Sequence, residues 1–398
     1  MVGKDRRGAL GTAKRWALRG IAAGFLAGAS AAGAATVSAS ACRPDWPRWE
    51  AFKHSFLSAD GRVIDVGSAD DRTVSEGQAY ALMFALVAND RATFDTVLRW
   101  TENNLAQGDL TSHLPAWLWG RDKDGAWHVL DQNAASDADL WIAYALMQAG
   151  ALWHERSYTA RASVLARHIV EQETATLPGL GLTLLPGPQG FHPNPDAWRV
   201  NPSYMPLQVL QGLAEALPDD ARWKRLAESA SAVLLGTAPR GYAPDWARYA
   251  TGRGFLPDPD TQAVGSYDAI RVYLWAGMLD PAQPGAKPLL ARLTPFADYI
   301  AEHGAPYESI DTTNGETKRS GNAGFSAAAV PFLSALGRSA AAAAQVERVQ
   351  SLEAQNPPGY YSSVLTLFGL GWLDGRYRFK ADGTLELRWR AACSGEER

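Results

Sequence analysis

The sequence predicts an all-α protein in which an inner ring of helices is enclosed by an outer ring, an α/α toroid. Helical periodicity of the apolar residues dominates the chain. Segments such as 77–86 are apolar nearly all round and rich in small residues, so they must be buried, whereas segments such as 220–228 carry one charged face and belong outside. Because no repeat of fixed period and no low-complexity linker divides the chain, we expect one domain.

The periodic segments are separated by loops rich in Gly, Pro, Asp and Asn, residues that interrupt helices. The end of the chain differs, because residues 376–379 and 384–389 flank an Ala-Asp-Gly turn at 381–383 and predict a small β-hairpin. The expected helices span residues 44–57, 75–88, 92–106, 137–153, 158–173, 203–216, 220–235, 267–278, 287–302, 324–336, 339–354 and 360–373.

The first forty residues have the layout of a secretory signal peptide. Six basic side chains between Lys4 and Arg19 precede an Ala/Gly/Leu run over 21–35, and Ala39-Ser40-Ala41 offers a cleavage site before Cys42. The apolar run is interrupted and too short to span a membrane comfortably. We therefore expect a signal peptide over 1–41 and a mature domain over 42–398. A disordered or membrane-anchoring N-terminus is the alternative, and Arg6-Arg7 leaves open either the Sec or the twin-arginine export route.

The predicted mature chain is acidic and poor in cysteine. Cleavage after residue 41 removes six basic side chains and one acidic one, which changes the formal net charge from −4 to −9. The negative net charge argues against nucleic acid or an anionic membrane as partner. Cys42 and Cys393 could form a disulfide that ties the termini together, with lipidation of Cys42 as the alternative.

No Cys/His group has zinc-ligand spacing, and no Gly-rich phosphate loop is present, so we expect neither metal nor cofactor. Chemistry must then come from acids and aromatic residues. Glu76, Asp137 (followed by Asp139) and Asp268 each stand at the start of a segment of the buried type. Any one of them could be a helix cap without chemistry. Since the inner helices of a toroid run parallel, however, the three carboxylates should converge on one rim.

Convergence of acids suits glycoside hydrolysis, which needs one acid protonated near neutral pH and another ionised. A helix N-terminus favours the ionised form, whereas burial and neighbouring carboxylates favour the protonated form. Glu76 would be the acid in which burial and neighbouring negative charges outweigh the helix N-terminus, so that its carboxyl is protonated. Arg271 lies one helical turn after Asp268 and could hold that carboxylate ionised or contact sugar.

Aromatic side chains in loops favour a polysaccharide substrate, because their faces stack on the apolar faces of pyranose rings. Ordinary packing within the fold is the alternative reading of each of them. The tryptophans that fall in loops are Trp117, Trp119, Trp127, Trp198 and Trp246.

Residues 135–153 resemble, position for position, the signature of glycoside hydrolase family 8. Residues 75–80, 266–271 and 201–204 resemble the family's proton-donor, catalytic-base and subsite segments. The resemblance runs from about Trp46 to Trp372. It is closest to the periplasmic endo-β-1,4-glucanases encoded with bacterial cellulose synthase, through stretches such as 103–108, 114–120 and 267–273.

The resemblance implies an (α/α)6 barrel with an open cleft that hydrolyses internal β-1,4-glucosidic bonds of cellulose with inversion. By position, Glu76 is the general acid, Asp268 the general base, and Asp137 holds the sugar and tunes the pKa of its neighbours. It also implies an exported, periplasmic or secreted enzyme, with the cellulose synthase complex as a partner and no membrane span after signal cleavage. The residues placed by it at sugar subsites are Trp117, Trp198, Tyr204, Tyr267, Arg271 and one of Tyr360 and Tyr361.

Two alternatives stay open at this point. A xylanase, lichenase or chitosanase of the same fold would share these motifs. A non-catalytic glucan-binding component of a cellulose-export machine would keep the fold without the chemistry, although both Glu76 and Asp268 are present. A lyase is disfavoured, because no Tyr/His or Lys base is grouped with a metal or arginine neutraliser.

Overall fold

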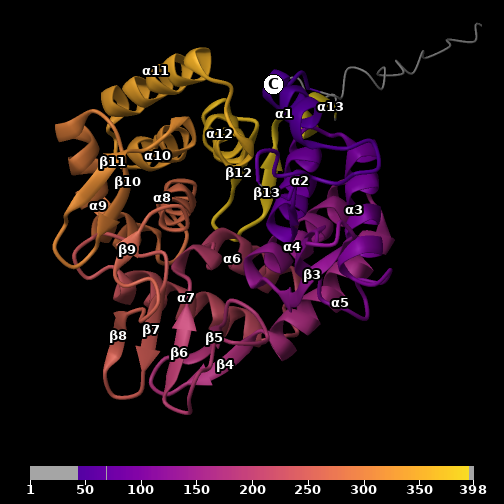
Figure 1. Ribbon diagram of the computed structural model, residues 1–398, viewed down its shortest axis with the longest axis horizontal. Coiled ribbons are helices and arrows are strands. Elements are labelled where there is room, and N and C mark those ends of the chain that lie inside the picture. The colour runs from indigo at the N-terminus through magenta and orange to yellow at the C-terminus, as the bar shows by residue number, and fades with distance from the viewer. Residues whose placement is uncertain (1–43, 69, 394–398) are drawn as a thin grey trace, which may run out of the picture. The chain divides into compact units, whose positions relative to one another are not determined.

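The computed structural model describes residues 44–68 and 70–393, with side chains to residue 390 (Figure 1). The predicted signal peptide and Cys42 lie outside the described residues, as does the side chain of Cys393. Within the described part, no helix combines the length and the apolar character that crossing a bilayer requires.

Inner and outer helices alternate along the chain, as the sequence predicts. The inner helices are α2 (Ser75–Val87), α4 (Ser136–Leu152), α6 (Leu207–Ala216), α8 (Ala269–Gly277), α10 (Ala323–Ala335) and α12 (Tyr360–Leu373). The outer helices are α1 (Pro47–Phe56), α3 (Arg91–Leu105), α5 (Arg156–Gln172), α7 (Arg222–Thr237), α9 (Ala286–His303) and α11 (Ser339–Gln355). Successive inner helices contact each other, and every inner helix also contacts at least one outer helix, which gives the (α/α)6 barrel.

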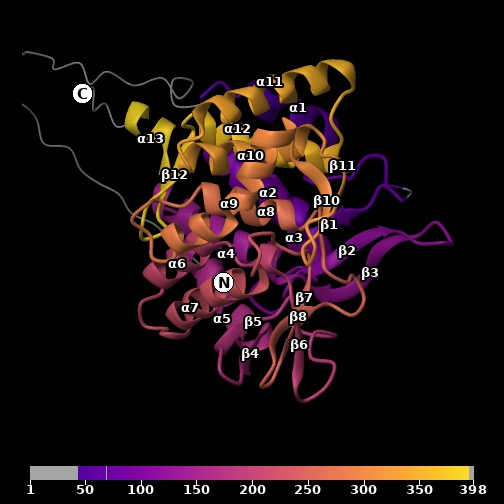
Figure 2. The same cartoon turned by 90° about the vertical axis from the view of Figure 1, so that its left-hand side faces the viewer.

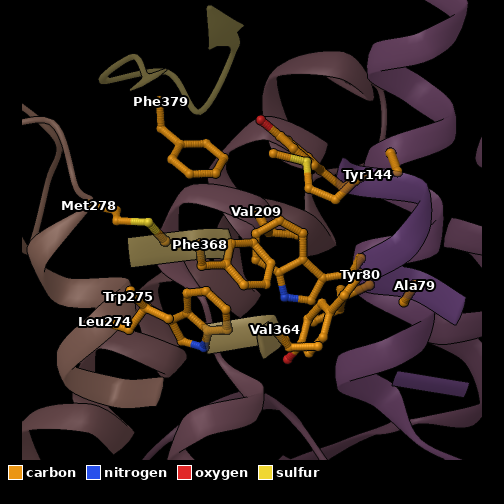
Figure 3. Close-up of a cluster of buried hydrophobic side chains, with 14 of the residues drawn as sticks. Ala79, Tyr80, Tyr144, Val209, Leu274, Trp275, Met278, Val364, Phe368 and Phe379 are labelled. Carbon is orange, nitrogen blue, oxygen red and sulfur yellow. The ribbon is translucent and has the colours of Figure 1, made fainter. Parts of the chain in front are cut away.

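The inner ring closes through aromatic side chains on its axis (Figure 3). Phe368 of α12 lies 4.6 Å from Phe84 of α2, between ring centroids, and so joins the last inner helix to the first. The same ring contacts Trp141 of α4 at 5.5 Å and Trp275 of α8 at 5.1 Å. One phenylalanine therefore contacts three other inner helices, and the centre of the barrel is a packed core.

Small residues allow the inner helices to approach each other closely. A Cβ added to Gly369 would overlap the carbonyl oxygen of Ala327, and one added to Gly277 would overlap the backbone of Phe332. These contacts explain why the buried segments are rich in Gly and Ala.

Five small sheets, which the sequence analysis did not predict except for the last hairpin, connect the helices. Their strands are β1 (Thr73–Val74), β2 (Ala116–Arg121) and β3 (Trp127–Ala134); β4 (Thr174–Leu177) and β5 (Gly181–Leu184); β6 (Ala197–Val200), β7 (Ala247–Ala250) and β8 (Gly254–Pro257); β9 (Val264–Gly265), β10 (Tyr307–Asp311) and β11 (Thr317–Ser320); and β12 (Tyr377–Phe379) and β13 (Leu385–Leu387). Several of these strands are only two to four residues long, and they are too short to show an alternating pattern.

Several predicted boundaries were wrong, and two of them have a clear physical reason. The expected helix over 203–216 begins as a 3-10 turn, η1 (Pro202–Tyr204), and the α-helix starts only after Pro206, which lacks the N–H that a continuous helix needs. The second strand of the C-terminal hairpin ends at Leu387, because the chain from Arg388 onward forms the short helix α13 (Arg388–Cys393).

Candidate active site

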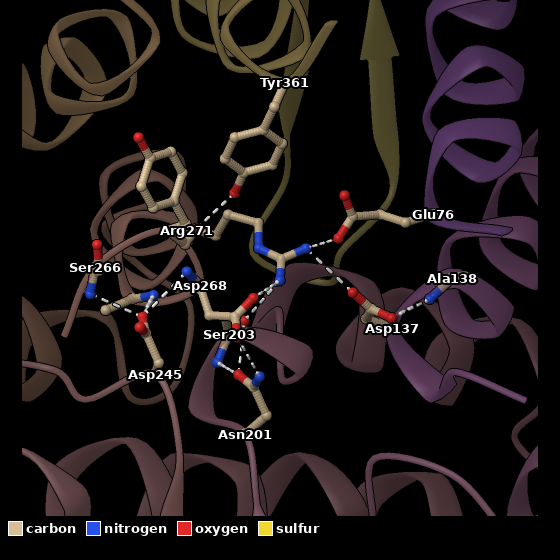
Figure 4. A network of polar contacts seen from close by, with 12 residues as sticks. Glu76, Asp137, Ala138, Asn201, Ser203, Asp245, Ser266, Asp268, Arg271 and Tyr361 are labelled. Carbon is tan, nitrogen blue, oxygen red and sulfur yellow. Dashed lines mark hydrogen bonds and ion pairs between the residues drawn. The ribbon is translucent and has the colours of Figure 1, made fainter. Parts of the chain in front are cut away.

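The three predicted acids converge on one buried arginine. Glu76 and Asp137 lie in the first turns of α2 and α4, and Asp268 is the residue before α8. The Arg271 guanidinium, only 2% exposed, forms ion pairs with all three carboxylates: one nitrogen contacts Glu76 and lies 3.1 Å from Asp137, and the other lies 2.7 Å from Asp268. The predicted convergence is therefore present, and its centre is the arginine (Figure 4).

Two of the three acids are partly exposed and the third is buried. The side chains of Glu76 and Asp268 keep 19% and 30% of their surface exposed, whereas that of Asp137 keeps 3%. Figure 4 shows Glu76 and Asp268 on opposite sides of the guanidinium. A ligand at this site can reach both outer carboxyls, while Asp137 lies deeper.

The charges in this cluster do not balance, since three carboxylates face one guanidinium. Burial raises the pKa of Asp137 to about 7. Burial is also the largest cause that raises the pKa of Asp268 to about 8, followed by the charges of Asp245 and Asp137. Hydrogen bonds from Asn201 and Trp246 oppose this rise. The cluster therefore retains a proton close to neutral pH, which acid–base chemistry requires.

Asp245 holds the turn that carries Asp268. One of its carboxylate oxygens accepts backbone N–H bonds from Ser266 at 2.8 Å, Asp268 at 3.0 Å and Ala269 at 2.7 Å. It thus caps α8 from a distant segment, where residue 268 itself provides no side-chain cap. The sequence analysis missed Asp245, because a cap from outside the helix leaves no local spacing signal.

We expect Asp245→Asn to shift the acidic limb of the kcat/KM profile to lower pH. Asparagine keeps an oxygen that can accept the three N–H bonds but removes a negative charge that raises the pKa of Asp268. With a lower pKa, Asp268 stays ionised at more acidic pH, so any step that needs this carboxylate ionised continues there. A pH series of initial rates measures the shift.

Asp245→Ala is the matched control, because it also removes the acceptor and should lower the rate at every pH. An acidic limb that stays in place in Asp245→Asn, or moves to higher pH, contradicts the electrostatic role.

Two further acids lie behind Asp137. Asp139 in the first turn of α4 and Glu173 at the end of α5 are both 0% exposed, and their carboxyls hydrogen-bond to each other. Among the described residues, no other group donates an N–H or O–H to any of the four oxygens. The pair must therefore share at least one proton, and burial raises the pKa of both groups. Glu173 was not singled out from the sequence, since only the fold brings the end of α5 to the start of α4.

Several predicted aromatic residues surround the acids. The Tyr204 ring lies 5.6 Å from the Arg271 guanidinium and 6.0 Å from the Trp246 ring. Tyr267 directly precedes Asp268 and is 45% exposed. The Tyr361 hydroxyl donates a hydrogen bond to the backbone oxygen of Tyr267 at 2.6 Å, and Figure 4 shows this ring beside Arg271.

Tyr360 and Trp198 are placed differently. Tyr360 is 5% exposed, and its ring packs against Phe52 and Phe56 of α1, so Tyr361 is the member of that pair that faces the acids. Trp198 is 4% exposed and stacks on His192 within a separate apolar cluster. Its ring offers no free face to a sugar in this structure. This tryptophan lies in a loop-like sequence, but it is on β6, and its ring is buried against Leu177, Leu185 and Tyr249.

Trp117 lies on β2, beside the entry to α2. Strand β2 pairs antiparallel with β1, with Val74 opposite Leu118, and β1 leads directly into Ser75 and Glu76. This register brings Trp117 to the level of the first residues of α2.

An (α/α)6 barrel with several acids at the starts of its inner helices and exposed aromatic rings beside them suits an enzyme that cleaves carbohydrate chains with a pair of carboxyls. The sequence model of the glycosyl hydrolases family 8 matches residues 26–375, and the chain belongs to this family. It is a glycoside hydrolase.

Relatives and solved structures agree with this membership. The chain is 50% identical to an endoglucanase of Xanthomonas axonopodis pv. citri (strain 306), over 94% of this chain and 97% of the relative. It is 45% identical to an endoglucanase of Escherichia coli (strain K12), over 88% and 93%. The crystal structure of endo-1,4-D-glucanase from Vibrio fischeri ES114 superposes with a TM-score of 0.83 at 44% identity, covering 87% of this chain and 99% of that one.

Proposed function

We propose that the protein is an inverting endo-β-1,4-glucanase in which Glu76 is the general acid and Asp268 the general base. The observation that carries the proposal is the pair of partly exposed carboxyls on opposite sides of Arg271. An inverting glycosidase needs its two carboxyls far enough apart to admit the sugar and a water molecule. Two acids that each contact the guanidinium, and not each other, suit this requirement.

In the proposed reaction, Glu76 gives its proton to the glycosidic oxygen as the bond to the anomeric carbon breaks. Asp268 takes a proton from a water molecule, whose oxygen attacks that carbon from the opposite face. Burial raises the pKa of Asp268, so once ionised it is a stronger base than an exposed aspartate. One displacement inverts the anomeric centre and needs no covalent intermediate.

Asp137 is proposed to position the sugar at the cleavage point. Its side chain is 3% exposed, and one oxygen contacts Arg271 at 3.1 Å while the other accepts the N–H of Ala138 at 2.8 Å. Both oxygens are held in place, which suits binding of a sugar hydroxyl better than nucleophilic attack.

The proposed substrate is cellulose or another β-1,4-glucan. The names of the relatives and of the Vibrio fischeri structure support glucan over other polymers. The fold does not choose among them, because a β-1,3-1,4-glucanase from Paenibacillus sp.X4 and a cold-adapted family 8 xylanase superpose with TM-scores of 0.66 and 0.64 at only 18% and 16% identity.

An NMR time course on a cello-oligosaccharide tests the reaction. We expect internal cleavage of β-1,4 bonds and an α-anomer as the first product, which then mutarotates. A β-anomer as the first product would overturn the inverting mechanism. Faster release of reducing ends from xylan, lichenan or chitosan than from carboxymethylcellulose would overturn the substrate.

We further propose that residues 1–41 are a signal peptide and that 42–398 form one catalytic domain, exported to the periplasm or secreted, where it acts on nascent cellulose beside the synthase complex. Cys42 and Cys393 are proposed to form a disulfide. Mass spectrometry of the exported protein without reductant tests the cleavage site and the disulfide together. Co-purification with inner-membrane components tests the link to the synthase.

A further inference from the structure

Most of the exposed large apolar side chains lie on segments connected to the acidic rim. Within the described residues, the exposed large hydrophobic side chains are Val66, Trp127, Val264, Tyr267 and Leu373. The first four belong to segments that lead into α2 or α8, or to the hairpin paired with β1; Leu373 ends α12. Trp127 is the largest of them and is 43% exposed, which is unusual for an indole without a partner molecule.

Trp127 is held rigidly although it is exposed. Its ring stacks on Trp119 across the β2–β3 hairpin, with centroids 5.1 Å apart and planes 21° from parallel. Trp119 in turn meets the edge of the buried Trp100 at 5.3 Å. The Arg62 guanidinium lies 4.5 Å from the Trp119 ring and 4.6 Å from the Trp127 ring. We call Arg62, Trp119 and Trp127 the hairpin platform.

The hairpin platform is tied to the helix that carries Glu76. Arg62 donates to the Thr73 hydroxyl at 2.8 Å, and Thr73 pairs with Trp119 in the strand that leads into α2. The loop that bears Arg62 is fixed by the buried Gln78 of α2, whose amide oxygen accepts the N–H of Val63 at 2.6 Å and whose amide nitrogen donates to Gly61 at 3.0 Å. The platform therefore cannot move far relative to the acid.

The hairpin platform lies along β2, further from the acids than Trp117. Trp117 and Trp119 lie on one strand, about 7 Å apart along its axis. Trp117 is level with the start of α2, and Trp127 stacks on Trp119 further out, where the hairpin extends away from the helices (Figure 2). A polymer chain that leaves the acids along β2 would pass from Trp117 to the exposed ring of Trp127.

We propose that the hairpin platform is an accessory binding site for the β-1,4-glucan chain, outside the cleft, which holds long chains so that internal bonds are cut. Pyranose rings present apolar C–H faces that stack on indole, and neutral sugar hydroxyls can accept from the guanidinium beside it. The proposal rests on the proposed glucanase function, and it predicts tighter binding of polymer than of short oligosaccharides.

Trp127→Ala in the Glu76→Gln background tests the platform by titration calorimetry with cellotriose and with a long soluble glucan. We expect the affinity for the long chain to fall about 2- to 10-fold relative to that for cellotriose, the effect of one lost aromatic contact. Trp127→Tyr should restore most of it. Trp372→Ala is the matched control, because Trp372 also packs under an arginine, with Arg378 at 4.3 Å, but lies near the end of α12.

Equal losses for short and long ligands, or no loss for the long chain in a variant that unfolds at the wild-type temperature, would overturn the platform. The same calorimetry with xylan separates this proposal from the proposed function. If xylan binding alone depends on Trp127, the site binds polysaccharide but its assignment to glucan is wrong.

Discussion

Glu76→Gln and Asp268→Asn should each lower kcat on carboxymethylcellulose by about 10²- to 10⁴-fold, the contribution of a single acid or base. Glutamine at 76 can still contact Arg271 but cannot give a proton to the glycosidic oxygen. Asparagine at 268 keeps one oxygen that can accept from Arg271 or from Asn201, but it cannot take a proton from water. Reducing-end assays on the two variants measure the loss.

The two variants should fold, because each replacement keeps the size of the side chain and an oxygen that can accept from Arg271. Thermal unfolding and substrate binding by calorimetry check this. Glu155→Gln is the matched control: Glu155 also stands at a helix start, as the N-cap of α5, but it lies on the surface, where it pairs with Arg91. Wild-type activity in Glu76→Gln or Asp268→Asn would show that the protein is not a two-acid hydrolase. It would then favour the non-catalytic glucan-binding alternative.

Arg271→Met should destabilise the folded protein by about 3–5 kcal/mol at pH 8 and abolish activity, because it leaves buried carboxylates without a counter-ion. Asp137 and Asp268 already have raised pKa values with the arginine present, so their charged forms are costly in the folded state. Without the guanidinium, both acids must take up protons to fold. Urea unfolding at several pH values measures the free energy.

The raised pKa values of Asp137 and Asp268 determine how the destabilisation by Arg271→Met changes with pH. An acid whose pKa is higher in the folded state than in the unfolded one favours folding at low pH, and this contribution is lost as pH rises through the folded pKa. The cost of Arg271→Met should therefore shrink from pH 8 to pH 5. Arg91→Met, at a half-exposed arginine that pairs with Glu155, is the control and should cost less than about 1 kcal/mol at every pH. Equal costs for the two variants would show that Arg271 does not compensate the buried charge.

Arg271→Lys distinguishes the contribution of the positive charge from that of the planar guanidinium group. Lysine keeps the positive charge but offers one nitrogen in place of the planar fork that contacts Asp268 on one side and Asp137 on the other. We expect part of the stability to return and most of the activity to stay lost. Full recovery of activity would mean that any cation at this position suffices.

The sequence by itself determined the ring of alternating helices and the acids at their starts. Both follow from local patterns. A segment such as α4, apolar all round, can only be an inner helix. The place of Asp137 in the first turn of that helix follows directly from its position in the sequence. The motif over 135–153 identified the family for the same reason, since it lies on a single helix.

Only the tertiary structure decided how these acids are held and which aromatic rings are free. Arg271 contacts residues far apart in sequence, and Asp245 and Glu173 reach the site from other segments. Trp198 and Trp127 look alike as loop tryptophans and both lie on paired strands, but an apolar cluster buries the first while the second stays 43% exposed. Burial, pKa and charge pairing depend on what surrounds a side chain in three dimensions, and spacing along the chain carries no record of those neighbours.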